Sequence, residues 1–147
     1  MKCLLIEDNP LKREKISEYL LSFRGTTISE ASSYNSGSTR ALQEDFDLII
    51  LDMSMPTFDR TGETHGGRFR ALGGRDIAMK LAKHGRLRPF VVVTGYKNFS
   101  VNSETLSIEQ INDSLIALGD SYKGYIIFDS AESDWKGKLS VIIKEMV

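Results

Sequence analysis

Short runs of apolar residues alternate along the chain with longer segments in which hydrophobic side chains return every three or four positions. The runs are typical of strands buried on both faces of a parallel sheet, and the longer spacing is typical of helices with one buried face. The predicted strands are residues 2–6, 26–31, 47–51, 88–94 and 125–128. The predicted helices are residues 10–24, 33–44, 75–84, 107–118 and 133–146.

The first predicted helix carries clear signals at both ends. An Asp-Asn pair at positions 8 and 9 offers a cap, and Pro10 stands at the first helical position, where a helix does not use the missing N–H. Ile16, Leu20 and Phe23 then share one helical face, and Gly25 provides a stop. Strand followed by helix is therefore the first structural unit.

Five strands that alternate with five helices predict an α/β domain, in which right-handed crossovers join parallel strands and helices cover both faces. The alternation is interrupted at about residues 57–74, where periodicity disappears and glycines and arginines accumulate. We expect this segment to be a loop. Because such sheets bind ligands beyond the carboxyl ends of their strands, the candidate chemistry is sought there.

Composition and charge narrow the class of protein. A chain of 147 residues with 41% hydrophobic residues can form one apolar core without disulfides or structural metal, so residues 1–147 are expected to be a single domain. The 19 Lys and Arg residues nearly balance the 20 Asp and Glu residues, so the net charge is −1. A net charge this close to zero gives no sign of the basic surface that nucleic-acid-binding proteins carry. No apolar run approaches the roughly 20 residues of a membrane-spanning helix. The lone cysteine, Cys3, fits a reducing compartment, and we expect a cytoplasmic protein with no membrane partner.

Acidic residues follow two of the predicted strands. Glu7 and Asp8 come directly after the first strand, Asp52 follows the third, and Thr94 ends the fourth. Because parallel strands end at one edge of a sheet, we expect the three carboxylates to converge opposite a hydroxyl. Such close carboxylates repel one another, and a hard cation such as Mg²⁺ is the usual partner of oxygen-only ligands. The alternative is that these residues cap the following helices, as Asp8 could do ahead of Pro10.

With these residues placed, the sequence resembles the receiver domain of two-component response regulators, which has the flavodoxin-like fold of the single-domain chemotaxis regulators. The resemblance rests on residues 4–9 (LLIEDN), 48–56 (LIILDMSMP), 91–95 (VVVTG) and 124–127 (GYII). It spans nearly the whole chain. It implies a doubly wound, five-stranded parallel sheet of order 2-1-3-4-5 with helices on both faces.

The resemblance implies a phosphoryl switch. Asp52 would be the phosphoacceptor, modified by a sensor histidine kinase, a phosphotransfer protein or a small phosphodonor. The ligands of Mg²⁺ would be Glu7, Asp8, Asp52 and the backbone carbonyl of Ser54. Thr94 would bind a phosphoryl oxygen, and Tyr125 would turn inward as the switch residue, which presents the fourth helix and fifth strand to a downstream protein. Outside this family context, Tyr125 would be interpreted as a core residue.

One departure from the family pattern concerns the charge of the site. The family normally has a Lys, then a Pro, at the end of the fifth strand, and the ammonium group pairs with the phosphoryl group and the acceptor carboxylate. Here Phe128 and Asp129 take these positions, so a phosphoryl dianion would be less stabilised. We hypothesise that Lys97 supplies the missing cation, because its loop borders the same edge.

A second departure is the length of residues 57–74, which exceeds that of the corresponding family loop. The segment is rich in glycine and arginine and lies next to Asp52, but it contains no nucleotide-binding motif. A mobile lid or a partner-binding insertion is favoured, and a solvated flexible loop is the alternative.

Three functions remain in contention. The leading one is a phosphorylatable single-domain receiver that acts by binding another protein and is not an enzyme beyond phosphorylating and dephosphorylating itself. We expect no output module and therefore no nucleic-acid partner. The second is a pseudo-receiver, an interaction module that phosphorylation does not switch because Phe128 replaces the lysine. The third, an aspartyl-phosphate phosphatase, ranks low because Ser54 stands where such enzymes carry a general acid. Whether activation drives homodimerisation stays open.

Overall fold

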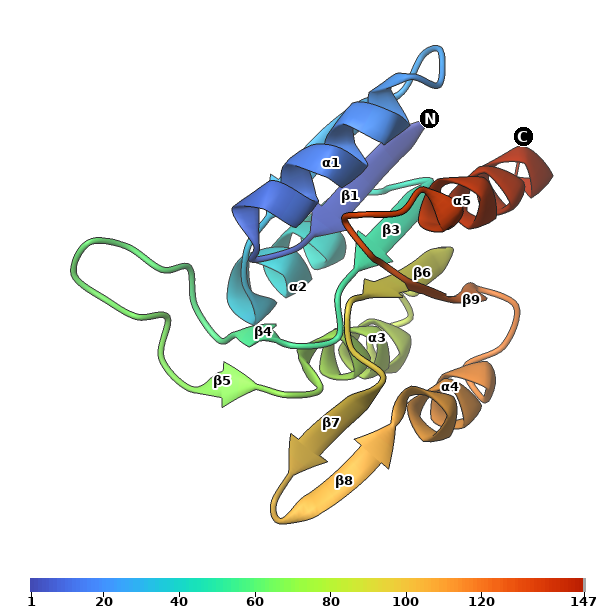
Figure 1. Cartoon of the computed structure of the whole chain (residues 1–147). Coiled ribbons are helices and arrows are strands. Elements are labelled where there is room, and N and C mark those ends of the chain that lie inside the picture. The colour runs from blue at the N-terminus through green and yellow to red at the C-terminus, as the bar shows by residue number, and fades with distance from the viewer. Residues whose placement is uncertain (147) are drawn as a thin grey trace.

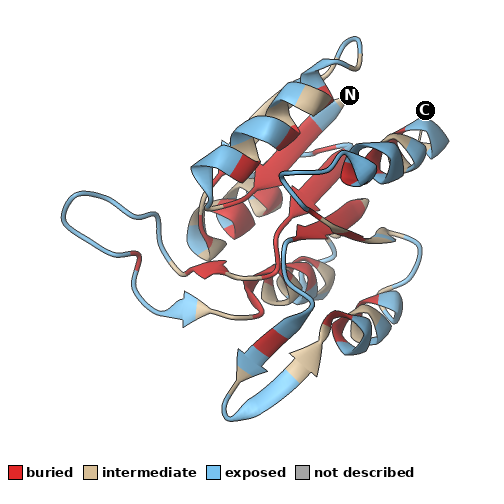
Figure 2. Ribbon diagram, in the orientation of Figure 1, coloured by how far each residue is buried: buried red, intermediate tan, exposed pale blue. Residues whose placement is uncertain are grey.

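A computed structural model describes residues 1–146. A parallel sheet of five strands forms its centre, and the strands are ordered β2-β1-β3-β6-β9 (Figure 1). These strands are β1 (Lys2–Ile6), β2 (Thr27–Ala31), β3 (Leu48–Leu51), β6 (Phe90–Thr94) and β9 (Tyr122–Ile127). Every residue of β3 and β6 is buried, as Figure 2 shows for the middle of the sheet, because helices cover both faces.

Within residues 1–146, five helices form the two outer layers (Figure 1). One face is covered by α1 (Pro10–Leu21) and α5 (Asp134–Glu145), and the other by α2 (Tyr34–Gln43), α3 (Gly73–Lys83) and α4 (Ile108–Ile116). The core is correspondingly split into two apolar clusters, one on each face of the sheet. In this part of the chain no helix combines the length and the apolar character that a membrane span requires.

The predicted fold class is confirmed, since the order of the five central strands is the predicted 2-1-3-4-5. The largest displacement of a strand boundary is in β9, which begins at Tyr122 rather than at residue 125. Its pairing with β6 shifts register, and Gly124 has a positive φ of 102°. A glycine in that conformation interrupts the apolar pattern without ending the strand, which explains the displaced boundary.

Two short antiparallel pairs extend beyond the parallel sheet, and the pattern of the sequence did not predict them. The first joins β4 (Met55–Pro56) to β5 (Phe69–Arg70) at the base of the predicted loop, so that loop is a strand-bounded extension rather than irregular throughout. The second is the hairpin of β7 (Asn98–Val101) and β8 (Glu104–Ser107) ahead of α4. Its turn has positive φ at both central residues, Asn102 and Ser103, as a two-residue turn of type I′ requires.

Helix α3 lies close to the loop that follows β3. The N–H of Gly74 donates a hydrogen bond to the carbonyl oxygen of Met53 at 2.8 Å. A Cβ atom at position 74 would collide with the backbone oxygen of Asp52 and lie 2.7 Å from Leu51 Cδ1. The glycine therefore allows the helix to approach the backbone that carries Asp52.

Candidate functional site

A cleft of about 1000 Å³ lies at the carboxyl ends of the central strands. The strand ends meet there because all five strands run in the same direction. The residues of the cleft that matter for its chemistry are Glu7, Asp8, Lys12, Asp52, Lys97 and Phe128. This is the edge at which the sequence predicted the site.

The three carboxylates that were expected to converge lie together. One oxygen from each of Glu7, Asp8 and Asp52 lies within 4.8 Å of the others. Glu7 is 1% exposed and Asp52 is 9% exposed, whereas Asp8 is partly open to the cleft. Burial and the neighbouring charge of Asp52 raise the pKa of Glu7 to about 7, against the lowering effect of Lys12.

The donor set fits a hard divalent cation. Three carboxylate oxygens at this spacing match the preference of Mg²⁺ for oxygen ligands. Because Asp8 is partly exposed, water could complete the coordination from the cleft side. The residues present therefore could hold Mg²⁺ at this edge of the sheet.

The first turn of α1 shows that the acidic pair is not used for capping. The side-chain oxygen of Asn9 accepts hydrogen bonds from the N–H groups of Leu11 at 3.0 Å and Lys12 at 3.1 Å. Asn9 is thus the cap, and the alternative in which Asp8 caps the helix is wrong. Glu7 fixes this turn from the other side, since its Oε2 accepts a hydrogen bond from the N–H of Asn9.

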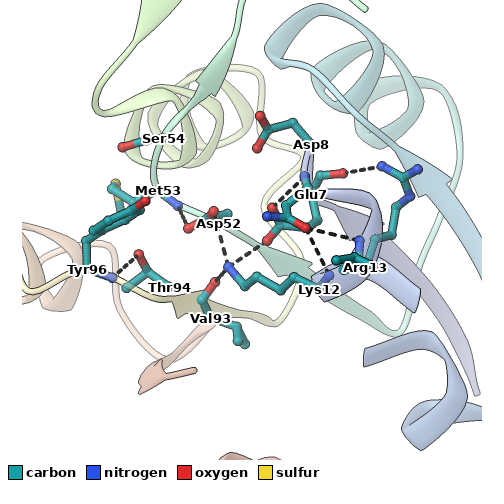
Figure 3. Close-up of polar contacts among 12 residues, drawn as sticks. Glu7, Asp8, Lys12, Arg13, Asp52, Met53, Ser54, Val93, Thr94 and Tyr96 are labelled. Carbon is teal, nitrogen blue, oxygen red and sulfur yellow. Dashed lines mark hydrogen bonds and ion pairs between the residues drawn. The ribbon is translucent and has the colours of Figure 1, made fainter. Parts of the chain in front are cut away.

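A lysine that the sequence analysis did not single out lies at the centre of the site (Figure 3). Lys12 Nζ is 2.6 Å from Glu7 Oε1 and 3.1 Å from Asp52 Oδ2, and it donates a hydrogen bond to the carbonyl oxygen of Val93 at 2.7 Å. Lys12 as a whole is only 8% exposed. The other oxygen of Asp52, Oδ1, accepts a hydrogen bond from the N–H of Met53 at 2.7 Å. Both carboxylate oxygens of Asp52 therefore have a partner, Met53 or Lys12.

Phe128 lies against the same lysine. The Lys12 ammonium is 5.7 Å from the centre of the Phe128 ring, which also packs on Trp135 of α5 at a centroid distance of 5.0 Å. The aromatic side chain thus forms an apolar wall of the cation site, and its quadrupole adds a cation–π attraction. Asp129 also lines the cleft, and its Oδ1 accepts a hydrogen bond from the N–H of Ala131 at 2.9 Å.

Lys97, the hypothesised substitute cation, lines the cleft but is exposed. Among residues 1–146 it forms no ion pair with a carboxylate, whereas Lys12 contacts Asp52 directly. The structure therefore places Lys12, and not Lys97, beside the acceptor. The spacing of four between Lys12, Ile16 and Leu20, which puts the lysine on the buried face of α1, is the signal that could have identified it.

The remaining predicted site residues surround the acidic cluster. Thr94 is fully buried, and its hydroxyl oxygen accepts a hydrogen bond from the N–H of Tyr96 at 3.3 Å. Ser54 lines the cleft, and its hydroxyl donates to the carbonyl oxygen of Ala71 at 2.7 Å. Tyr125 is half-buried in β9 and packs on the core cluster beneath α2, α3 and α4. Their phosphoryl-binding, metal-binding and switch roles stay predictions.

The loop between β4 and β5 reaches back to the site. Arg60 forms an ion pair with Asp8 at 3.2 Å. Next to it, Asp59 Oδ1 accepts hydrogen bonds from three hydroxyl groups at the start of α2, those of Ser33 at 2.6 Å, Ser36 at 2.7 Å and Ser32 at 3.1 Å. A carboxylate is favourable at this helix N-terminus, so Asp59 fastens the loop that carries Arg60.

The Asp59 contacts predict a pH-dependent contribution to stability. The serine hydroxyls lower the pKa of Asp59 below its ordinary value of 3.8. Since the native pKa is the lower one, the contribution is present above pH 3.8 and disappears as the pH falls through the native pKa. We expect Asp59→Asn to lower the melting temperature at pH 7 and to differ less from wild type at pH 3. Glu63→Gln in the same loop is the control, and equal shifts for both variants would contradict the prediction.

No family model matches the sequence. Over 151 aligned residues the chain is 32% identical to the Detocs response regulatory protein DtcB of Enterobacter cloacae, and the match covers 99% of this chain and 100% of that protein. In structure, the chain is similar to a CheY-like response regulator receiver domain protein from Methanospirillum hungatei, with a TM-score of 0.66 and 19% identity over 99% of this chain and 92% of that chain. It is also similar to the response regulator TrrA of Thermotoga maritima in complex with Mg²⁺–BeF, with a TM-score of 0.65 and 18% identity over 99% of this chain and 98% of that chain.

Proposed function

Because this chain belongs to the response-regulator receiver family, we propose that it is a single-domain phosphoryl switch whose acceptor is Asp52. A sensor histidine kinase or a phosphotransfer protein would supply the phosphoryl group, and the phosphorylated form would bind a downstream protein. The observation that carries the proposal is the position of Asp52, buried at the end of β3 beside two further carboxylates and the ammonium of Lys12.

The transfer itself needs little from the protein beyond alignment and charge compensation. One carboxylate oxygen of Asp52 attacks the phosphorus of a phosphohistidine, and an O–P bond forms as the N–P bond breaks. The electron pair of the broken bond stays on the histidine nitrogen, which takes up a proton from solvent so that a neutral imidazole leaves. Asp52 is held for this attack by the N–H of Met53 at 2.7 Å and by Lys12 at 3.1 Å.

The acidic cluster supplies the metal ligands in this proposal. The residues that would hold Mg²⁺ are Glu7, Asp8, Asp52 and the backbone carbonyl of Ser54. When bound, Mg²⁺ neutralises the charge on the phosphoryl oxygens. Arg60 contacts only Oδ2 of Asp8, at 3.2 Å, so the other oxygen of that carboxylate is available as a ligand.

The output of the switch would involve Thr94 and Tyr125. We expect the buried Thr94 hydroxyl to donate a hydrogen bond to a phosphoryl oxygen, and Tyr125 to turn into the space that Thr94 leaves. Both residues lie on neighbouring strands, because Thr94 ends β6 and Tyr125 pairs with Val92 in β9. Movement of Tyr125 would then alter the surface of α4 and β9 that a partner meets.

One observation favours the second candidate, an interaction module that phosphorylation does not switch. Lys12 already compensates Glu7 and Asp52, and Arg60 compensates Asp8. Two cations of the chain itself therefore already offset much of the negative charge of the three carboxylates, without a metal or a phosphoryl group.

Intact mass spectrometry separates the two candidates. The protein is incubated with acetyl phosphate and Mg²⁺, and the covalent addition of one phosphoryl group is followed over time. We expect the addition in wild type, its absence in Asp52→Asn, and its loss when EDTA removes the metal. A wild-type protein that stays unmodified with both acetyl phosphate and a phosphorylated phosphotransfer protein would support the interaction module instead.

A further inference from the structure

The ammonium group of Lys12 joins the ends of three neighbouring strands. Its three contacts are a carboxylate oxygen of Glu7 after β1, a carboxylate oxygen of Asp52 after β3, and the backbone oxygen of Val93 in β6. An ammonium group has three N–H donors, so each donor has an acceptor here. Such complete coordination fixes the cation beside Asp52 (Figure 3).

We propose that Lys12 is the phosphoryl-binding cation of this site, pairing with Asp52 before phosphorylation and with a phosphoryl oxygen afterwards. The family resemblance gives that role to a lysine at position 128, where this chain has phenylalanine. The proposal rests on the proposed function, since it presupposes that Asp52 is phosphorylated. It moves the cation from the end of β9 to the first turn of α1.

The side chain at position 128 supports the relocated lysine. The N–H of Phe128 donates to the carbonyl oxygen of Thr94 at 2.9 Å, so its backbone is fixed at the strand ends. Its ring, backed by Trp135, faces the Lys12 ammonium at 5.7 Å. An apolar wall excludes water from that side of the ion pair, and a charge in a less polar environment interacts more strongly with its partner.

The charge of Lys12 and the length of its flexible side chain also suit it to bind a phosphoryl group on Asp52. Among residues 1–146, Lys12 is the cation within ion-pair distance of Asp52, and phosphorylation increases the negative charge at this position. The lysine stem is flexible and its ammonium is a compact point charge, so it can follow an oxygen added to Asp52. Glu7 keeps the ammonium in the site during this shift, because their contact of 2.6 Å does not depend on Asp52.

The test compares the phosphorylation rates of five folded proteins with acetyl phosphate and Mg²⁺. They are wild type, Lys12→Gln, Lys12→Arg, Lys97→Gln and the double variant Lys12→Gln/Phe128→Lys. Intact mass spectrometry gives the initial rates, and circular dichroism establishes that each variant is folded. Lys97→Gln is the matched control, since it removes another lysine that lines the cleft but forms no ion pair with Asp52 among the described residues.

We expect Lys12→Gln to slow phosphorylation by about 100-fold, as removal of one donor to a developing charge does in other sites. Lys97→Gln should stay within about twofold of wild type, because exposed charges contribute little. The added lysine of the double variant should restore most of the rate. A purely structural role for Lys12 does not predict this rescue, since position 128 cannot replace packing in α1.

Each contrary result has a distinct meaning. A wild-type protein that is not phosphorylated overturns the proposed function and this inference together. A phosphorylated wild type with an equally fast Lys12→Gln variant overturns this inference alone. If Lys12→Gln does not fold, Lys12→Arg and the double variant Lys12→Gln/Phe128→Lys decide the matter, because each keeps one cation beside Asp52. Both should retain much of the wild-type rate, and folded proteins that are both phosphorylated at least 100-fold more slowly than wild type then overturn the proposal.

Discussion

Replacing Lys12 with methionine is expected to lower the free energy of unfolding by about 3 kcal/mol. Removal of one partner from a buried ion pair leaves an uncompensated charge, which typically costs about 3–5 kcal/mol, and the adjoining cleft places this site at the low end. Glu7 and Asp52 would then face one another within 4.8 Å without the ammonium group that now lies between them. Urea unfolding at neutral pH measures the difference.

Two further variants show whether the loss comes from charge. Lys15→Met removes an exposed lysine from the same helix and should change stability by at most about 0.5 kcal/mol. The double variant Glu7→Gln/Lys12→Met should recover part of the loss, because it also removes one of the two facing carboxylates. If Lys12→Met is as harmless as Lys15→Met, the buried ion pair contributes little to stability and our account of the site is wrong.

Gly74→Ala should lower the free energy of unfolding by about 2 kcal/mol, within the range of overpacked buried positions. The added methyl group would meet the backbone oxygen of Asp52 and Leu51 Cδ1. Backbone cannot rotate away as a flexible side chain does, so α3 and the loop after β3 must separate. Because that loop carries Asp52, we expect slower phosphorylation as well as lower stability.

Gly137→Ala is the matched control, because position 137 lies inside α5 with no atom within 4 Å of the added Cβ. Alanine is a better helix former than glycine, so this variant should gain about 0.5–1 kcal/mol. The two substitutions are chemically identical and are expected to act in opposite directions. Losses of similar size in urea unfolding would show that contact with the acceptor loop does not decide the outcome.

The parallel sheet could be predicted from sequence because its strands are buried on both faces. Runs such as residues 48–51 and 90–94 are apolar throughout, and turn or cap residues bound them. The same reasoning predicted the acidic cluster, since the direction of parallel strands decides which residues share an edge. Glu7 and Asp52 were thus placed together although 45 positions separate them in the numbering of the chain.

The cation of the site could not be predicted in the same way. Lys12 lies on a helix, and strand direction says nothing about how far a flexible lysine side chain extends. The strand ends and the loops that follow them therefore pointed to Lys97 as the cation. A lysine in line with Ile16 and Leu20 on a buried helical face had to have a buried acceptor, and the nearest acidic residues were those of the first strand.

The hairpins were missed for a different reason. The hairpin from β7 to β8 has one fully buried apolar residue, Phe99, so its alternating pattern is weak. Its turn residues, Asn102 and Ser103, adopt positive φ values of 49° and 69°, which only a turn-specific search would have considered. The pair formed by β4 and β5 has two residues in each strand, too few for any periodicity to appear.

The adjoining positions of Lys12 and Phe128 constrain how such a site can evolve. An ancestor with lysine at position 128 that lost it first would leave buried carboxylates uncompensated, and selection against the unfolded and inactive protein would remove it. A lineage that gained Lys12 first would pass through a form with two ammonium groups facing three carboxylates, in which the buried carboxylates always keep a cation beside them. Relatives that retain both lysines are therefore the expected intermediates, and relatives with neither should be rare unless another cation has entered the cleft.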